Sequence, residues 1–128
     1  MIGRLKRRAE FLQVAAANRK WVAPGLILQV RRQPSTERES DDAPRAAQLE
    51  AVRVGFTASR KVGNAVKRNR ARRRLRAAAA EVLPQAEPGM DFVLIARAAT
   101  VDRDYQALVA DLVAGLKRLK LYRAGDAR

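Results

Sequence analysis

The sequence predicts one small domain of the α/β class, more closely an α+β arrangement. Its 128 residues are within the size of a single domain and can bury one core. Segments with apolar residues at helical spacing alternate with short apolar runs between turns, in the order α-β-β-α-β-α. Hydrophobic residues make up 48% of the chain but only 5% of its residues are aromatic, so we expect a core with few large side chains.

Three segments are predicted helices because their apolar residues recur every three to four positions. They are residues 9–17, residues 65–82 and a C-terminal helix that begins at Asp102 or Asp104. The middle helix follows a turn at Gly63, has Asn64 as a candidate cap, and ends before Pro84. The last helix carries the apolar stripe Leu108, Val109, Leu112, Leu116 and Leu119.

Three apolar runs are predicted strands. They are residues 26–30, residues 51–58 and residues 92–96, and a short extended piece at residues 20–23 is expected to pair beside the first. The run from Phe92 to Ala96 is apolar on both faces, which is typical of a buried strand. We therefore expect a sheet of about four strands that packs with three helices.

Residues 33–48 differ in composition from the rest of the chain. Their acidic residues outnumber their basic ones, and they contain almost no large apolar residues. Because nothing there offsets the entropy of ordering, we predict a mobile acidic loop, with a partner-binding loop as the alternative. The loop lies within a domain predicted to span residues 1–122, and residues 123–128 are predicted to be a disordered tail.

The charge of the chain points to a polyanionic partner. Its formal net charge is +14 and its pI is near 11.5, so the compact protein repels itself unless a polyanion neutralises it. Nucleic acid is the predicted partner, and a solvated basic surface or an anionic membrane surface are the alternatives. The N-terminus lacks the apolar core of a signal peptide, and no segment has membrane-spanning length, so we expect a cytoplasmic protein without a membrane partner.

The residues needed for independent catalysis are scarce. The chain has neither histidine nor cysteine, which removes the commonest general base and the commonest metal ligands. Its acids outside the loop are spread thinly, and the neighbouring Asp102 and Asp104 are better explained as helix-start residues. We therefore predict no catalytic residue, no metal site and no small-molecule substrate for this chain.

One basic segment dominates the sequence. Residues 53–76 contain ten basic residues and no acidic residue: Arg53, Arg60, Lys61, Lys67, Arg68, Arg70, Arg72, Arg73, Arg74 and Arg76. Surface helices usually place opposite charges four residues apart, whereas here every such pair repels. A phosphate backbone of similar spacing would compensate this repulsion, and a solvated basic helix is the alternative.

A helical wheel divides residues 64–82 into an apolar and a basic face. The apolar stripe consists of Ala71, Leu75, Ala78, Ala79 and Val82, extended by Asn64 and Arg68. The opposite face carries Asn69, Arg70, Arg73 and Arg76, flanked by Arg72 and Arg74. Arginine suits a bidentate grip on phosphate, and Asn69 offers both a donor and an acceptor to a base edge or a 2′-hydroxyl.

Residues 55–73 resemble the signature of the bacterial ribonuclease P protein family. They read Gly-Phe-Thr-Ala-Ser-Arg-Lys-Val-Gly-Asn-Ala-Val-Lys-Arg-Asn-Arg-Ala-Arg-Arg, and the core of the signature is Arg68-Asn69-Arg70, preceded by Gly63-Asn64-Ala65-Val66. The similarity extends more weakly to residues 4–11 and 91–97. It covers most of the chain apart from the acidic loop and the tail.

The resemblance implies a two-layer sandwich similar to the second domain of ribosomal protein S5, with a mixed sheet and a left-handed crossover. It also implies an accessory subunit that assists ribonuclease P RNA in removing the 5′ leader of precursor tRNA. No cofactor is expected on the protein, and Mg²⁺ is expected at the active site of the RNA. The implied contacts to the catalytic RNA are Asn64, Lys67, Arg68, Asn69, Arg70, Arg72, Arg73 and Arg76.

A cleft between the first helix and the sheet is implied as the site of the single-stranded leader. The positions that match it are Phe11, Arg60, Lys61 and Arg97. Ala15 and Gln29 stand where aromatic residues are common in the family, so leader binding would depend more on charge, since a stacked base contributes about 1–3 kcal/mol. The alternative for Phe11 is a core residue, and Trp21 is expected to be a packing residue.

Two other functions are compatible with the charge and the size. A structural RNA-binding protein, such as a ribosomal protein, would not require the ordered Gly-Asn-Ala-Val and Arg-Asn-Arg motifs. A DNA-binding regulator would place the arginine helix in a major groove, but the second helix of a helix-turn-helix is missing. The motifs therefore favour the ribonuclease P subunit over both.

Overall fold

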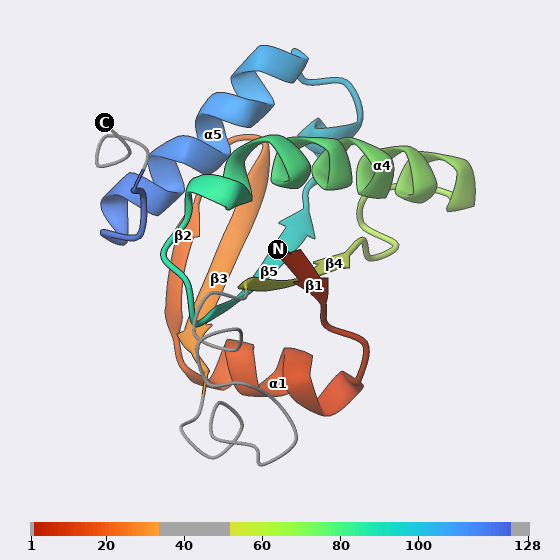
Figure 1. Ribbon diagram of the computed structural model, residues 1–128. Coiled ribbons are helices and arrows are strands. Elements are labelled where there is room, and N and C mark those ends of the chain that lie inside the picture. Colours follow the sequence, from red (N-terminus) through yellow and green to blue (C-terminus); the bar gives the residue numbers. More distant parts are fainter. Residues whose placement is uncertain (1, 34–51, 124–128) are drawn as a thin grey trace.

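A computed structural model describes residues 2–33 and 52–123, which form five strands, three α-helices and two short 3-10 helices (Figure 1). The strands are β1 (Ile2–Arg4), β2 (Arg19–Val22), β3 (Leu26–Arg32), β4 (Val52–Thr57) and β5 (Met90–Ala96). The α-helices are α1 (Arg8–Ala16), α4 (Ala65–Val82) and α5 (Tyr105–Arg118), and the 3-10 helices are η1 (Leu83–Gln85) and η2 (Ala98–Val101). The three predicted helices are confirmed, α4 with the predicted bounds.

The strands form one mixed sheet in the order β1-β4-β5-β3-β2. Strand β3 is antiparallel to both of its neighbours, whereas β4 is parallel to β5 and to β1. Helix α4 connects the parallel strands β4 and β5, so it is the crossover helix of the sheet. Strand β5 is central and almost wholly buried, as its apolar sequence predicts.

The expected number of four strands was too low, because β1 was not predicted. This strand has only three residues and includes Gly3 and Arg4, so it has no apolar alternation to reveal it. It forms by pairing with β4, from Ile2 opposite Val52 to Arg4 opposite Val54. Such a short strand depends on its partner, and the sequence alone does not show that partner.

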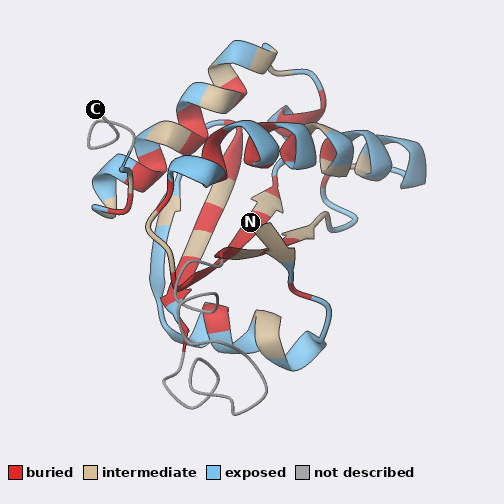
Figure 2. Cartoon of the chain, in the orientation of Figure 1, coloured by how far each residue is buried: buried red, intermediate tan, exposed pale blue. Residues whose placement is uncertain are grey.

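Helices α4 and α5 pack on one face of the sheet, and α1 lies on the other face (Figure 1). The main core lies between the sheet and the α4–α5 layer, where Phe92 is the only fully buried aromatic residue among those described (Figure 2). Alternate residues of β5 point to the other face, where Val93 packs with Leu5 and Val14 of the α1 side. The core is thus built mainly from leucine, valine and alanine, as the composition predicts.

The α1 face of the sheet also holds a buried group of charges. Asp91 on β5 is fully buried, and its carboxylate accepts hydrogen bonds from Arg31 Nε at 3.0 Å and Arg53 Nε at 2.8 Å. Arg53 also reaches the carboxylate of Glu10, which accepts bonds from the backbone N–H groups of Lys6 and Arg7. Burial raises the pKa of Glu10, but these backbone bonds and the charge of Arg53 bring the pKa below its usual value.

Helix α5 begins after Asp104, one of the two aspartates that were predicted to start it. The carboxylate of Asp104 accepts a hydrogen bond from the N–H of Ala107, so Asp104 caps the helix. Leu108, Leu112 and Leu116 of the predicted stripe are buried.

The predicted acidic loop and tail lie mostly outside the described residues. Gln33, at the start of the predicted loop, is buried, and its Nε2 donates to the carbonyl of Met90 at 3.3 Å. Arg123, at the start of the predicted tail, donates its N–H to the carbonyl of Gln85 at 2.7 Å. Both residues are therefore hydrogen-bonded to described elements of the fold.

Replacing Asp91 by asparagine is expected to lower the free energy of unfolding by about 3–5 kcal/mol, because it removes the buried charge that Arg31 and Arg53 share. Urea unfolding followed by circular dichroism measures this change. Asp102→Asn is the control, since Asp102 is exposed, and it should stay within about 0.5 kcal/mol of the unmodified protein. Equal stability of the two variants would show that the charge group contributes nothing.

Candidate nucleic-acid interface

The start of α4 is fixed by its own sequence. Asn64 Oδ1 accepts a hydrogen bond from the N–H of Lys67 at 2.9 Å, which caps the helix as predicted. Gly63 has a φ of 144°, and a Cβ added there would lie 2.7 Å from Lys67 Cδ, so the turn into the helix requires glycine. The predicted apolar stripe is buried against the sheet: Ala71, Leu75, Ala78, Ala79 and Val82.

Two arginines of α4 turn toward the connection between β5 and α5. Arg70 Nε donates to the carbonyl of Val101 at 2.9 Å, and Arg74 Nε donates to the carbonyl of Thr100 at 2.9 Å. Arg74 also donates to the carbonyl of Arg103. The wheel placed Arg70 on the outer face, and Arg70 is exposed, although the backbone of η2 holds its guanidinium.

Three other bases lie on the flank of α4 that faces β4. Arg68 is half-buried, as predicted, and Arg72 and Arg76 follow it at intervals of four residues. The guanidinium of Arg76 lies 5.8 Å from the centre of the Phe56 ring, within the range of a cation–π contact. Arg4 lies 5.5 Å from the same ring. Arg76 is thus exposed, as the wheel predicts, and its guanidinium also reaches the ring of Phe56 at the sheet edge.

The outermost row of α4 remains exposed. Asn69 and Arg73 face outward, as the wheel predicts, and Lys67 near the start of the helix is exposed as well. Asn69 Oδ1 accepts a hydrogen bond from Arg72 Nη1 at 3.0 Å, so its acceptor is engaged within the helix. Val66 is the most exposed large apolar residue among those described, at 76%. This row is the part of α4 that a flat or convex partner reaches first.

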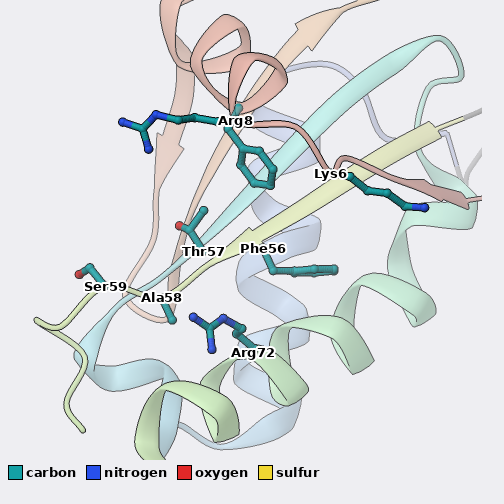
Figure 3. A pocket seen from close by; sticks show the side chains of 8 residues that line it. Lys6, Arg8, Phe56, Thr57, Ala58, Ser59 and Arg72 are labelled. Atoms are coloured by element: carbon teal, nitrogen blue, oxygen red, sulfur yellow. The ribbon is translucent and has the colours of Figure 1, made fainter. Parts of the chain in front are cut away.

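An open groove of about 490 Å³ lies between α1, the end of β4 and α4 (Figure 3). Its lining residues are Lys6, Arg8, Phe11, Phe56, Thr57, Ala58, Ser59 and Arg72. They supply two aromatic rings, three bases and two hydroxyl groups, which is the chemistry of a site for single-stranded nucleic acid. Because Arg72 belongs to α4, the groove is continuous with the arginine helix.

Phe11 packs on the sheet and also lines the groove. Its ring packs on the backbone of β4, where a Cβ added to Gly55 would lie 2.4 Å from Phe11 Cζ, and it contacts the apolar residues of the α1 side. The ring is only half-buried, and it also lines the groove. Gly55 therefore leaves the space that the ring occupies against the sheet.

The bases assigned to the cleft by resemblance do not line this groove. Arg60 and Lys61 are exposed in the connection from β4 to α4, and Arg97 Nη1 donates to the carbonyl of Ala23 at 2.7 Å. The groove instead takes its bases from Lys6, Arg8 and Arg72. The sequence signal for the first two was the basic N-terminus, whose place beside the groove depends on the pairing of β1 with β4.

The described residues contain no group of three or more histidine, cysteine, aspartate or glutamate side chains that could hold a metal ion. In the same part of the chain, no helix combines the length and the apolarity that crossing a membrane requires. Most charged side chains among the described residues belong to arginine or lysine.

Comparison with known proteins identifies the family. The family model described as Ribonuclease P matches residues 3–120 of the chain. The chain belongs to the ribonuclease P protein family. The ribonuclease P protein component of Paramagnetospirillum magneticum is 52% identical over 119 residues, which cover 92% of this chain and 83% of the relative. The ribonuclease P protein component of Gluconacetobacter diazotrophicus is 48% identical over 117 residues, which cover 90% of this chain and 89% of the relative.

Solved structures of ribonuclease P proteins share the fold. The protein from Staphylococcus aureus superimposes with a TM-score of 0.70 at 21% identity, covering 94% of this chain and 97% of that one. The protein from Thermotoga maritima gives a TM-score of 0.69 at 22% identity, covering 90% and 96%. The chain is thus an RNA-binding subunit of ribonuclease P, a tRNA-processing endoribonuclease that also contains an RNA subunit.

Arg74→Gln is expected to lower the free energy of unfolding by about 1–3 kcal/mol, because it leaves the carbonyls of Thr100 and Arg103 without their charged donor. Arg73→Gln removes the same charge from the exposed row of the same helix and should change stability by less than about 0.5 kcal/mol. Thermal unfolding of the two variants measures the difference. Equal losses would mean that the contacts of Arg74 do not hold α4 in place.

Proposed function

We propose that the chain binds ribonuclease P RNA through the exposed row of α4 and binds the 5′ leader of precursor tRNA in the groove. The observation that supports this division is the position of Arg72, which lies on α4 and lines the groove. A single RNA-covered surface can therefore extend from the arginine helix to α1. The leader would leave the catalytic centre of the RNA and enter the protein along this surface.

The outer row of α4 suits a folded RNA. Lys67, Asn69 and Arg73 are exposed. Arg70 and Arg76 are exposed as well, although the η2 backbone and the ring of Phe56 position their guanidinium groups. Side chains that are already positioned lose less entropy on binding phosphate than free ones do. No acidic residue occurs between Arg53 and Arg76 to repel the phosphates. Binding should accordingly weaken steeply as salt is raised.

The groove suits a single strand. Phe11 and Phe56 offer apolar ring surface to bases, while Lys6, Arg8 and Arg72 offer charge to phosphates. Gln29, where the family often has a tyrosine, lies on the α1 face of β3 and cannot stack a base. Ala15 is exposed on α1 and adds no ring either. Charge is therefore expected to contribute more to leader binding here than in relatives with additional rings.

The protein would contribute affinity and charge shielding, and the RNA would contribute the chemistry. Hydrolysis of a phosphodiester needs stabilisation of negative charge, commonly by metal ions, and we propose that Mg²⁺ acts at the RNA active site. The bases of the chain would reduce the repulsion between the two RNAs and so lower the Mg²⁺ concentration that cleavage requires. Because both RNAs are cytoplasmic, we place the protein in the cytoplasm.

The test is cleavage of precursor tRNA by bacterial ribonuclease P RNA at low Mg²⁺, with and without the chain. The chain is expected to stimulate removal of the 5′ leader, and absence of stimulation would contradict the proposed function. Leaders of several nucleotides and of one nucleotide are compared, because only the long leader reaches the groove.

Phe11→Ala is expected to raise the KM for the long-leader substrate about 5- to 100-fold, as loss of a stacked base does, and to leave the short-leader substrate nearly unchanged. Leu12→Ala is the matched control, because Leu12 is its neighbour on α1 and is 55% exposed. Thermal unfolding shows whether Phe11→Ala folds. An equal effect on both substrates would assign Phe11 to the core alone.

A further inference from the structure

A second basic surface lies at the C-terminal end of α5. Five exposed bases form it, and we call it the α5-end surface: Arg19, Lys117, Arg118, Lys120 and Arg123. Arg19 comes from β2, and the other four come from the last turn of α5 and the segment that follows it. Figure 1 shows this end of α5 beside β2, on the side of the molecule away from the start of α4.

Contacts between β2 and α5 position two bases of this surface, Arg19 and Arg118. Arg19 Nη2 donates to the carbonyl of Leu119 at 2.9 Å. The guanidinium of Arg118 lies 5.0 Å from the centre of the Trp21 ring. Trp21 packs on α5, where a Cβ added to Gly115 would lie 3.0 Å from Trp21 Cδ1. Trp21 is thus the packing residue that the sequence predicted, and it also orients a base.

The segment after α5 is held just as firmly. The N–H of Leu121 donates to the carbonyl of Leu116 at 2.7 Å, which closes the helix end, and the carbonyl of Leu121 accepts from Glu87 at 2.8 Å. Tyr122 Oη donates to Gln85 Oε1 at 2.9 Å, and the ammonium of Lys117 lies 5.3 Å from the Tyr122 ring. These bases therefore extend from a fixed framework and not from a loose tail.

Lys120 is the informative residue of the surface. Its φ is 64°, in the left-handed region, at the position after a helix where glycine is strongly preferred. The equivalent position after α1 holds Asn18, which tolerates this conformation better than lysine does. Within the described residues, no hydrogen bond or ion pair engages the Lys120 side chain. A lysine at a glycine position, with its charge unused in the fold, indicates a partner outside the chain.

The charges around this surface are mostly unbalanced. Glu87 lies 3.7 Å from Arg123, and both side chains are partly exposed. The buried carboxylate of Asp111 is already bonded to Arg103 and to the N–H of Gly25. Bases in the last turn of a helix favour its dipole, which accounts for Lys117 and Arg118. That effect does not account for the bases from β2 or from beyond the helix.

We propose that the α5-end surface binds phosphates of ribonuclease P RNA at a second place, separate from α4. Positively charged residues on a rigid surface recognise a phosphate backbone without reading its sequence. The surface lies away from the groove proposed for the leader, so the RNA subunit is the RNA that reaches it. This inference uses the RNA partner of the family, and its choice of the RNA subunit over precursor tRNA rests on the proposed leader site.

The experiment is Lys120→Gly, measured by the Kd for ribonuclease P RNA across a range of salt concentrations. Glycine relaxes the left-handed backbone while it removes the charge, so thermal stability should rise or stay constant as RNA affinity falls. Loss of one phosphate contact predicts an affinity about fivefold weaker near 0.15 M salt and a salt slope shallower by about 0.9. Opposite signs for stability and affinity cannot come from misfolding.

Lys20→Gln is the matched control, because Lys20 is exposed on the same strand as Arg19 but points to the opposite face of the sheet. Its Kd and salt slope should change by less than half as much as those of Lys120→Gly. An unchanged Kd for Lys120→Gly, an equal loss in Lys20→Gln, or a loss confined to precursor tRNA would overturn the proposal. If the unmodified chain does not bind the RNA at all, the proposed function fails instead.

Discussion

Helix α4 contacts the sheet through a stripe of alanines with Leu75 and Val82, and this contact places every arginine of the helix. Small side chains let the helix lie close to the sheet, so bases on its flanks come within reach of neighbouring elements. One flank meets the carbonyls of η2, and the other meets the ring of Phe56. The bases are thereby spread over three directions around the helix, and the exposed ones remain available to the RNA.

The packing of α4 on the sheet also joins the basic surface of α4 to the groove, two surfaces that were predicted separately from the sequence. Arg72 carries the charge of α4 into the groove, where Phe11 and the bases before α1 form the other wall. That wall depends on the close packing of Phe11 against Gly55 and on the ion group around Asp91, which fixes α1 through Arg53 and Glu10. The ion group beneath α1 thus holds that helix in place beside the groove, whose lining residues form few hydrogen bonds with one another.

Local patterns predicted much of this arrangement. The cap at Asn64, the bounds of α4 and its buried stripe all followed from spacing and residue type, because they depend on neighbours in the sequence. The contacts of Arg70 with η2 and of Arg76 with Phe56 did not, since a wheel gives the angle around the helix axis but not the element that lies beside it. Strand β1 and the groove bases Lys6 and Arg8 were missed for the same reason: their places depend on pairing with a distant strand.

The central claim is that the outer row of α4 lies against ribonuclease P RNA. Because the chain has no cysteine, Ala77→Cys on the exposed side of α4 gives a single attachment point for an iron chelate that cuts nearby RNA with hydroxyl radicals. Gln13→Cys, exposed on α1 on the other face of the sheet, is the reference position. We expect strong cuts at a few sites of the bound RNA from Ala77→Cys and weak cuts from Gln13→Cys. Cuts from Ala77→Cys no stronger than those of the free chelate, in a complex shown to have formed, would contradict the account.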